Sequence, residues 1–110
     1  MQNVIISVSG FNGQITLFEN RIDITRKGFR AFMSHGFDGT KSIFLSKLSG
    51  IQFKEAGAMT RGYIQFIFSG SAESKDGLFD AAKDENTVMF DKKDEADFIK
   101  IRDFIFEKLQ

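Results

Sequence analysis

The sequence predicts an α+β domain in which about seven antiparallel strands form a bent sheet or partly open barrel, capped by one C-terminal amphipathic helix. Three observations lead to this prediction. Up to residue 90, short alternating runs of β-branched and aromatic residues are separated by glycines. The 14 phenylalanines and the absence of tryptophan favour a core built from phenylalanine. Beyond residue 91, the apolar period changes from two residues to 3.6, which indicates a helix.

The N-terminal part predicts three short strands joined by tight turns. Val4–Ser9 is rich in β-branched residues, and the following Asn12-Gly13 is typical of a type I′ hairpin turn because both residue types tolerate positive φ. Gln14–Glu19 is the predicted return strand. After a further turn, Arg21–Arg26 alternates isoleucine with polar residues, which is the pattern of a half-buried strand.

The middle of the chain is less regular. Residues 27–40 carry three glycines among several apolar residues, and we interpret them as a strand or a wide loop with apolar anchors. Residues 70–85 are mostly polar and are interpreted as a surface loop with a small apolar anchor at 78–79. The other predicted strands are Ser42–Leu45, Gly50–Lys54, Tyr63–Ser69 and Thr87–Phe90.

Residues 92–109 are predicted to form the helix, with Asp91 as its cap. The apolar face of this helix is wider than a single stripe of inward-facing residues, because Ile99, Phe104 and Phe106 lie beside that stripe. A helix of this kind is either deeply inserted or shared with another chain. The stripe itself comprises Phe98, Ile101, Ile105 and Leu109.

Composition and charge exclude several classes of function. Basic and acidic residues both number 15, so the chain lacks the basic excess of nucleic-acid-binding domains, and no nucleic-acid partner is expected. Without cysteine there is no disulfide framework, thiolate zinc site or cysteine nucleophile. The length of 110 residues fits one domain, residues 1–110. The first ten residues lack the basic and apolar regions of a signal peptide, so a cytoplasmic location is expected.

No residue pattern indicates an enzyme, a cofactor or a metal. His35 lies next to Ser34 and close to Asp38, but neighbouring residues of an extended segment point apart and build no triad. No glycine-rich phosphate loop occurs. The residues of one acidic cluster are mostly four positions apart, whereas the ligands of a calcium-binding loop occupy alternate positions. We therefore interpret this cluster as part of a solvated acidic loop. The cluster comprises Asp76, Asp80, Asp84 and Glu85.

A basic cluster in and after the third predicted strand is the first candidate site. Grouped cations can hold a phosphate-bearing lipid headgroup. The alternative is that these residues form the solvated face of a half-buried strand. The cluster comprises Arg21, Arg26, Lys27 and Arg30.

Apolar residues form a second candidate site, a contact surface for a protein partner or a second subunit. Part of it lies in the irregular stretch, where the alternative is a loop anchored in the core. The rest lies on the helix, outside the apolar stripe. The candidate residues are Phe29, Phe32, Met33, Phe37, Phe104 and Phe106.

Several sequence blocks resemble an uncharacterised family of bacterial and phage proteins with a pleckstrin-homology-like (PH-like) fold. The resemblance implies a seven-stranded barrel-like sheet closed by a C-terminal helix, and it implies no activity or ligand. Lipid-binding members of the wider PH-like group use a basic, open first hairpin loop, whereas the early turns predicted here are tight. The blocks are Gly10–Gln14, Arg26–Gly28, Gly39–Ile43, Ile51–Lys54, Gly62–Phe66 (GYIQF) and Asp84–Phe90, which contains DENTV.

Together these observations predict a non-enzymatic binding or scaffolding module that engages protein, either another chain or further copies of itself. A sheet edge, the Gly28–Gly39 segment or the helix would make the contact. The alternative is a peripheral membrane module that binds anionic lipid headgroups through the basic cluster.

Overall fold

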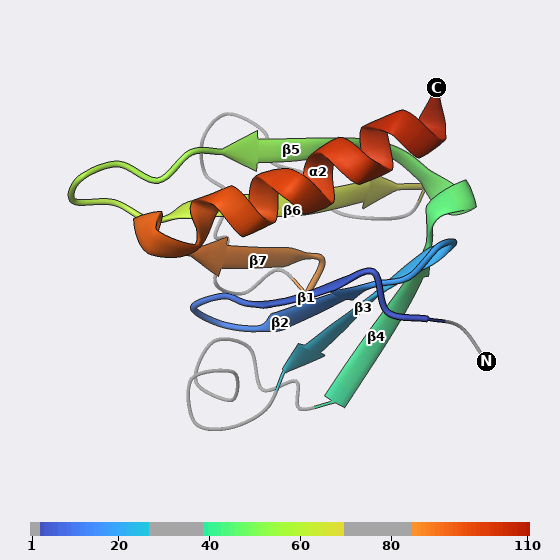
Figure 1. The fold of residues 1–110 in the computed structure, drawn as a ribbon, viewed down its shortest axis with the longest axis horizontal. Helices are drawn as coiled ribbons and strands as arrows, with labels where there is room; N and C mark the ends of the chain where they lie inside the picture. The colour runs from blue at the N-terminus through green and yellow to red at the C-terminus, as the bar shows by residue number, and fades with distance from the viewer. Residues whose placement is uncertain (1–2, 27–38, 70–84) are drawn as a thin grey trace.

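Two antiparallel sheets and a C-terminal helix form the part of the chain that the computed structural model describes, residues 3–26, 39–69 and 85–110 (Figure 1). The strand order is β1-β2-β3-β4 in the first sheet and β5-β6-β7 in the second. The chain is therefore an α+β protein. The elements are β1 (Ile6–Ser9), β2 (Gln14–Leu17), β3 (Arg21–Arg26), β4 (Gly39–Phe44), η1 (Leu45–Lys47), β5 (Leu48–Lys54), β6 (Gly62–Phe68), β7 (Thr87–Phe90), η2 (Lys92–Asp94) and α2 (Glu95–Leu109).

β3 shows how the sequence forms the first sheet. Every second residue from Ile22 to Arg26 is buried, and the residues between them are half-buried on the opposite face. This alternation follows from the two-residue period of a strand. β3 pairs with β2 along one edge and with β4 along the other, so its isoleucines lie in the middle of the sheet.

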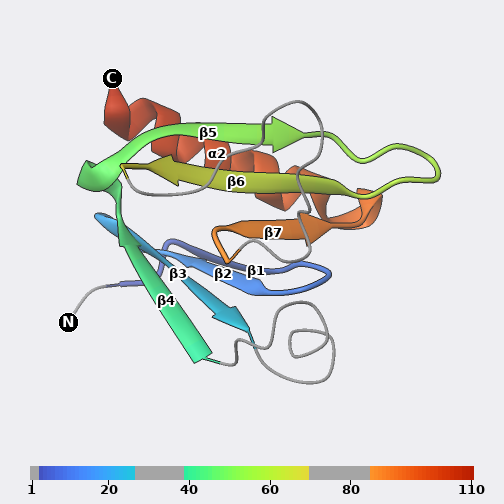
Figure 2. The same ribbon diagram turned by 180° about the vertical axis from the view of Figure 1, so that it is seen from behind.

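α2 lies across one face of the second sheet, in front of β5 and β6 in Figure 1 and behind them in Figure 2. Its inward side chains Phe98, Ile101 and Ile105 are fully buried. The Phe98 ring stacks on Phe90 of β7 with 4.5 Å between ring centroids. The apolar stripe of the helix therefore closes the core over the second sheet.

The β5–β6 loop is held tightly against the start of α2. The buried Glu95 carboxylate accepts a hydrogen bond from the Ala56 N–H at 3.1 Å. Gly62, the first residue of β6, packs so closely that an added Cβ would lie 2.3 Å from the Lys54 carbonyl oxygen and 2.8 Å from the Ala56 nitrogen. Only glycine fits this approach of one backbone to another.

Two buried polar side chains join the first sheet to β7. Asn12, in the β1–β2 loop, accepts a hydrogen bond from the Met89 N–H at Oδ1 (2.9 Å). Arg26 is fully buried, and its guanidinium donates to the carbonyl oxygens of Asn12 (2.8 Å), Thr87 (2.5 Å) and Glu85 (3.2 Å). We call this set of bonds the Arg26 clamp. It links the β1–β2 loop, β3 and the start of β7.

The structure confirms the α+β class and the C-terminal helix. The strands in the described part of the chain form two antiparallel sheets, of four and three strands, and no closed barrel. After β4 the 3₁₀ turn η1 redirects the chain, and β5 pairs with β6 instead of continuing the first sheet.

Three local predictions are also corrected. β1 begins at Ile6, not at Val4. The β1–β2 loop spans four residues, closed by a Gly10 N–H···Gly13 carbonyl bond of 2.7 Å, so the two-residue turn at 12–13 is wrong. The Asp91 side chain makes no cap hydrogen bond and instead pairs with Arg61 at 2.9 Å.

Candidate functional site

Phe44 is the exposed aromatic side chain around which the candidate site is built. It ends β4, and the two-residue period turns it outward because Ile43 before it is buried in the core. The side chain of Phe44 is 51% exposed. It borders two neighbouring hollows in the surface.

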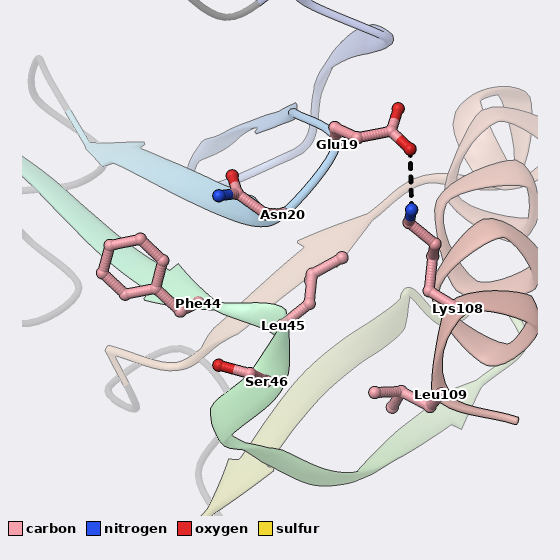
Figure 3. Close-up of a pocket in the computed structure, with 7 residues that line it drawn as sticks. All are labelled: Glu19, Asn20, Phe44, Leu45, Ser46, Lys108 and Leu109. Atoms are coloured by element: carbon pink, nitrogen blue, oxygen red, sulfur yellow. Dashed lines mark hydrogen bonds and ion pairs between the residues drawn. The ribbon is translucent and has the colours of Figure 1, made fainter.

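The first hollow, which we call the turn hollow, has a volume of about 300 Å³. Three segments that are distant in the sequence form it: the β2–β3 turn, η1 and the last turn of α2 (Figure 3). The Leu45 N–H donates to the Asn20 carbonyl at 2.9 Å, and Lys108 Nζ pairs with Glu19 Oε1 at 2.6 Å. Its walls are Glu19, Asn20, Phe44, Leu45, Ser46, Lys108 and Leu109.

The second hollow, which we call the strand hollow, has a volume of about 240 Å³ and mostly apolar walls. Lys41 lies over the Phe68 ring, 5.6 Å from its centroid, and pairs with Glu85 at 2.7 Å. Lys47 is exposed and forms no ion pair with the residues that the structure describes. The lining residues are Lys41, Ser42, Ile43, Phe44, Lys47 and Phe68, none of them acidic.

The two hollows and Phe44, together called the Phe44 surface, form a shallow, partly apolar region of the surface. Enclosed pockets for small molecules hold about 300–1,000 Å³, so these two open hollows lie at or below the lower limit. Leu109 adds a second apolar side chain that is 41% exposed. Charged side chains border this apolar centre, as in many protein interfaces.

A third hollow of about 570 Å³ lies at the opposite end of the molecule, between the β5–β6 loop and η2 (Figure 1). Its walls are the exposed loop from Gly57 to Arg61 and the residues from Asp91 to Lys93. Met59 at this loop is 94% exposed. This hollow is larger than the turn hollow and the strand hollow, but we do not place the candidate site there, because no buried apolar side chain lines it.

The structure separates the predicted basic cluster. Arg21 and Arg26 are five positions apart on one strand and therefore point to opposite faces. Arg21 is on the outer face, stacked on Phe18 at 4.1 Å and bonded to Asp23 at 3.0 Å. Arg26 is fully buried in the clamp, so its guanidinium is not accessible to a lipid headgroup. Lys27 and Arg30 lie outside the described residues.

The predicted apolar contact residues are only partly described. Phe104 packs partly buried against the core, and Phe106 is 43% exposed. Neither of them lines the two hollows beside Phe44. Outside the described residues lie Phe29, Phe32, Met33 and Phe37, as well as His35, Asp76, Asp80 and Asp84.

Sequence reasoning missed Phe44, Leu109 and Glu19. The signal for Phe44 was the apolar run Ile43-Phe44-Leu45 at a strand end, because alternation must turn one residue of such a run outward. Leu109 was assigned to the buried stripe, but the last turn of α2 extends beyond the core. No sequence signal places Glu19 beside Lys108, since 89 residues separate them.

The described residues offer neither a cluster of metal ligands nor a membrane-spanning helix. No group of three or more His, Cys, Asp or Glu side chains in that part of the chain is arranged to hold a metal ion. None of the helices described has the combined length and apolar character needed to cross a membrane.

Comparison with known proteins identifies a family. The model of a family named as a domain of unknown function, DUF4429, matches residues 17–105, from the last residue of β2 into α2. No curated protein and no solved structure matches the chain. The match covers well over half of the sequence, including all of the second sheet. The chain therefore belongs to the DUF4429 family.

Proposed function

We propose that this chain is a non-enzymatic protein-binding module with a PH-like fold and that its Phe44 surface contacts the partner. The succession of four antiparallel strands, three antiparallel strands and a C-terminal helix supports the PH-like fold. The observation that carries the function is Phe44, whose ring is 51% exposed between two hollows. An exposed aromatic side chain within a polar rim is a common anchor of protein interfaces.

The expected contribution of Phe44 is large enough to matter for binding. Covering the exposed part of a phenylalanine side chain contributes about 1–2 kcal/mol, and an aromatic anchor seated in a hollow contributes more. Leu109 extends the apolar area across the turn hollow. The ion pair between Glu19 and Lys108 at the rim would then contribute more to the orientation of the partner than to the binding affinity.

Site-specific photo-crosslinking in the cells that produce the protein tests this proposal. Benzoylphenylalanine in place of Phe44 should form covalent adducts with protein, seen as bands heavier than the monomer and identified by mass spectrometry. The same probe in place of Met59, which is more exposed but lies in the β5–β6 loop, is the matched control. Equal labelling from both positions, or none from position 44, would contradict a role of the Phe44 surface.

The alternative function, binding of anionic lipid headgroups through the basic cluster, has weaker support. Arg26 donates to backbone carbonyls inside the protein, and Arg21 is bonded to Asp23. The cluster therefore does not present the four free cations that the sequence led us to expect.

We accordingly expect the purified protein not to sediment with vesicles containing 30% phosphatidylserine, at low or at physiological salt. Neutral phosphatidylcholine vesicles serve as the control. Sedimentation with the anionic vesicles alone, lost as salt rises, would instead support the membrane function, because headgroup contacts are screened by ions.

A further inference from the structure

We propose that the outer edge of β4 adds a strand from a partner protein, an extended segment that carries apolar and acidic side chains. This inference rests on the proposed function and specifies how the partner contacts the Phe44 surface. Strand addition is a common mode of peptide recognition, in which the backbone of an edge strand supplies the hydrogen bonds. β4 lies at one end of the first sheet, and the strand hollow lies beside it (Figure 1).

In the described part of the chain, the other three sheet edges are short, irregular or covered. β1 has only four residues. The pairing of β5 with β6 shifts register between Leu48 and Gly50, and such irregularities oppose the addition of a strand. On β7, the Met89 carbonyl accepts the Phe11 N–H, and the Met89 N–H donates to Asn12 Oδ1. β4 has six residues in continuous register with β3, and no described strand pairs with its other edge.

The backbone N–H and C=O of Ser42 point toward this outer edge. In an antiparallel pair, residues that exchange hydrogen bonds with the neighbouring strand alternate with residues that do not. The Leu45 N–H bonds to the Asn20 carbonyl, so the alternation assigns the bonds with β3 to Ile43 and Lys41. Ser42 lies between them, and no described strand bonds to its outward backbone groups.

The lining of the strand hollow shows that the hollow runs along the same edge. All four consecutive residues 41–44 line it, although neighbouring strand residues point to opposite faces. A hollow that touches both faces of a strand lies at its edge, and β3 occupies the other edge of β4. Phe68 of β6 and Lys47 of η1 complete the hollow. A strand added to β4 would therefore place side chains in this hollow.

The chemistry of the strand hollow suits an apolar side chain and a carboxylate. Its walls are mostly apolar and include the rings of Phe44 and Phe68. No acidic residue lines it. Lys41 already pairs with Glu85, whereas Lys47 is exposed and forms no ion pair with the described residues. An added strand with an apolar residue for the hollow and an acidic residue beside Lys47 meets both requirements.

A second copy of β4 does not provide this chemistry. The segment Gly39–Phe44 contains Lys41 and no acidic residue. Pairing two such edges would bring the lysines of both copies toward one interface, and like charges across an interface are unfavourable. The charges beside β4 therefore favour a different protein as the source of the added strand.

Selection of peptides by the purified full chain tests the proposed chemistry. The probe is a phage-displayed library of random peptides with six residues, the length of β4. We expect the enriched peptides to alternate apolar residues with other residues and to carry aspartate or glutamate. Enriched peptides without acidic residues or without alternation would overturn the proposed occupant, and so would a selection that enriches no peptide.

Ser42→Pro tests the strand addition itself. Proline removes the N–H that points to the outer edge and leaves the bonds between β3 and β4 in place, a position where edge strands tolerate proline. An enriched peptide, measured by fluorescence anisotropy, should bind this variant at least about tenfold more weakly than the wild type. Ser42→Ala loses the hydroxyl that donates to Asp23 at 2.6 Å but keeps the N–H. This matched control should bind within about twofold of the wild type, and equal binding by both variants would overturn strand addition.

Lys47→Glu tests the acidic contact. This variant should bind the same peptide about threefold to tenfold more weakly, because it places a carboxylate beside the acidic residue of the peptide. Lys93→Glu makes the same change at an exposed lysine of the third hollow and should leave binding unchanged. Equal binding by the two variants would overturn the role of Lys47.

Hydrogen exchange in the wild type, followed residue by residue by NMR, provides a test that requires no substitution. Circular dichroism shows whether Ser42→Pro is folded, and the exchange experiment decides the proposal if it is not. The peptide should slow exchange of the Ser42 amide and of the Thr40 amide, which points to the same edge. A bound peptide that leaves both rates unchanged would overturn strand addition.

Photo-crosslinking from position 44 separates this inference from the proposed function. Protein adducts that disappear in Ser42→Pro and persist in Ser42→Ala are expected. Adducts that persist in both variants would overturn strand addition and leave the protein-binding function in place. Adducts composed only of two copies of the chain would overturn a different protein as the source of the strand. A lack of adducts from position 44, together with a selection that enriches no peptide, would overturn both.

Discussion

Replacing Arg26 with methionine is expected to destabilise the protein by at least about 3 kcal/mol. Methionine fills similar space but donates no hydrogen bond. The buried carbonyl oxygens of Asn12 and Thr87 would each lose a donor, as would the partly buried carbonyl of Glu85. An unsatisfied buried polar group costs about 1–3 kcal/mol. Urea unfolding followed by far-UV circular dichroism measures the loss.

Arg21→Met is the matched control for this change, because it alters the same residue type on the same strand. Arg21 lies on the outer face, where its ion pair with Asp23 is partly exposed to solvent. Such pairs contribute about 0–1 kcal/mol, so the control should remain close to the wild type. If the two variants unfold at the same urea concentration, the Arg26 clamp does not stabilise the protein.

The second large effect is expected at Gly62, where alanine should cost about 3 kcal/mol or more. The added Cβ would lie 2.3 Å from the Lys54 carbonyl oxygen and 2.7 Å from Cε1 of Phe90. Neither a backbone oxygen nor a core ring can move away without separating β5 from β6 or disturbing the stack with Phe98. The unfolding midpoint in urea should fall accordingly, with an unchanged slope because the surface exposed on unfolding is similar.

Gly50→Ala in the neighbouring strand β5 is the matched control. An added Cβ there meets no atom within 4 Å. Alanine also restricts the unfolded chain, so this variant should be neutral or more stable by up to about 1 kcal/mol. Equal destabilisation at both positions would mean that a general intolerance of side chains in this sheet, and not the close packing at Gly62, causes the loss.

The strands and helix could largely be predicted because they depend on local patterns. Residues 21–26 and 87–90 were placed at their observed bounds, since alternation and residue type are properties of the strand itself. The division into two sheets could not be predicted in this way. It depends on η1, three residues whose turn is set by the packing of Leu45 in the core.

The candidate sites were harder to predict than the fold. The alternation that identified β3 also places Arg26 on the buried face of the strand. The basic cluster was defined by charge and closeness in sequence alone, so it included Arg26 in spite of this position. The turn hollow combines residues near 20, 45 and 108, and such long-range contacts leave no periodic signal. Only Phe44 had a local signal, because a run of three apolar residues at a strand end cannot be buried completely.

The Arg26 clamp also bears on the order in which the chain assembles during synthesis. The guanidinium finds acceptors 59 and 61 residues later in the sequence, at Glu85 and Thr87. Until the ribosome has released those residues, an N-terminal sheet that buried Arg26 would enclose a cation short of these partners, at considerable cost. Closing so long a loop is also slow. We therefore expect that the first sheet does not complete its packing as an independent early unit and that Arg26 becomes buried only after β7 has been synthesised.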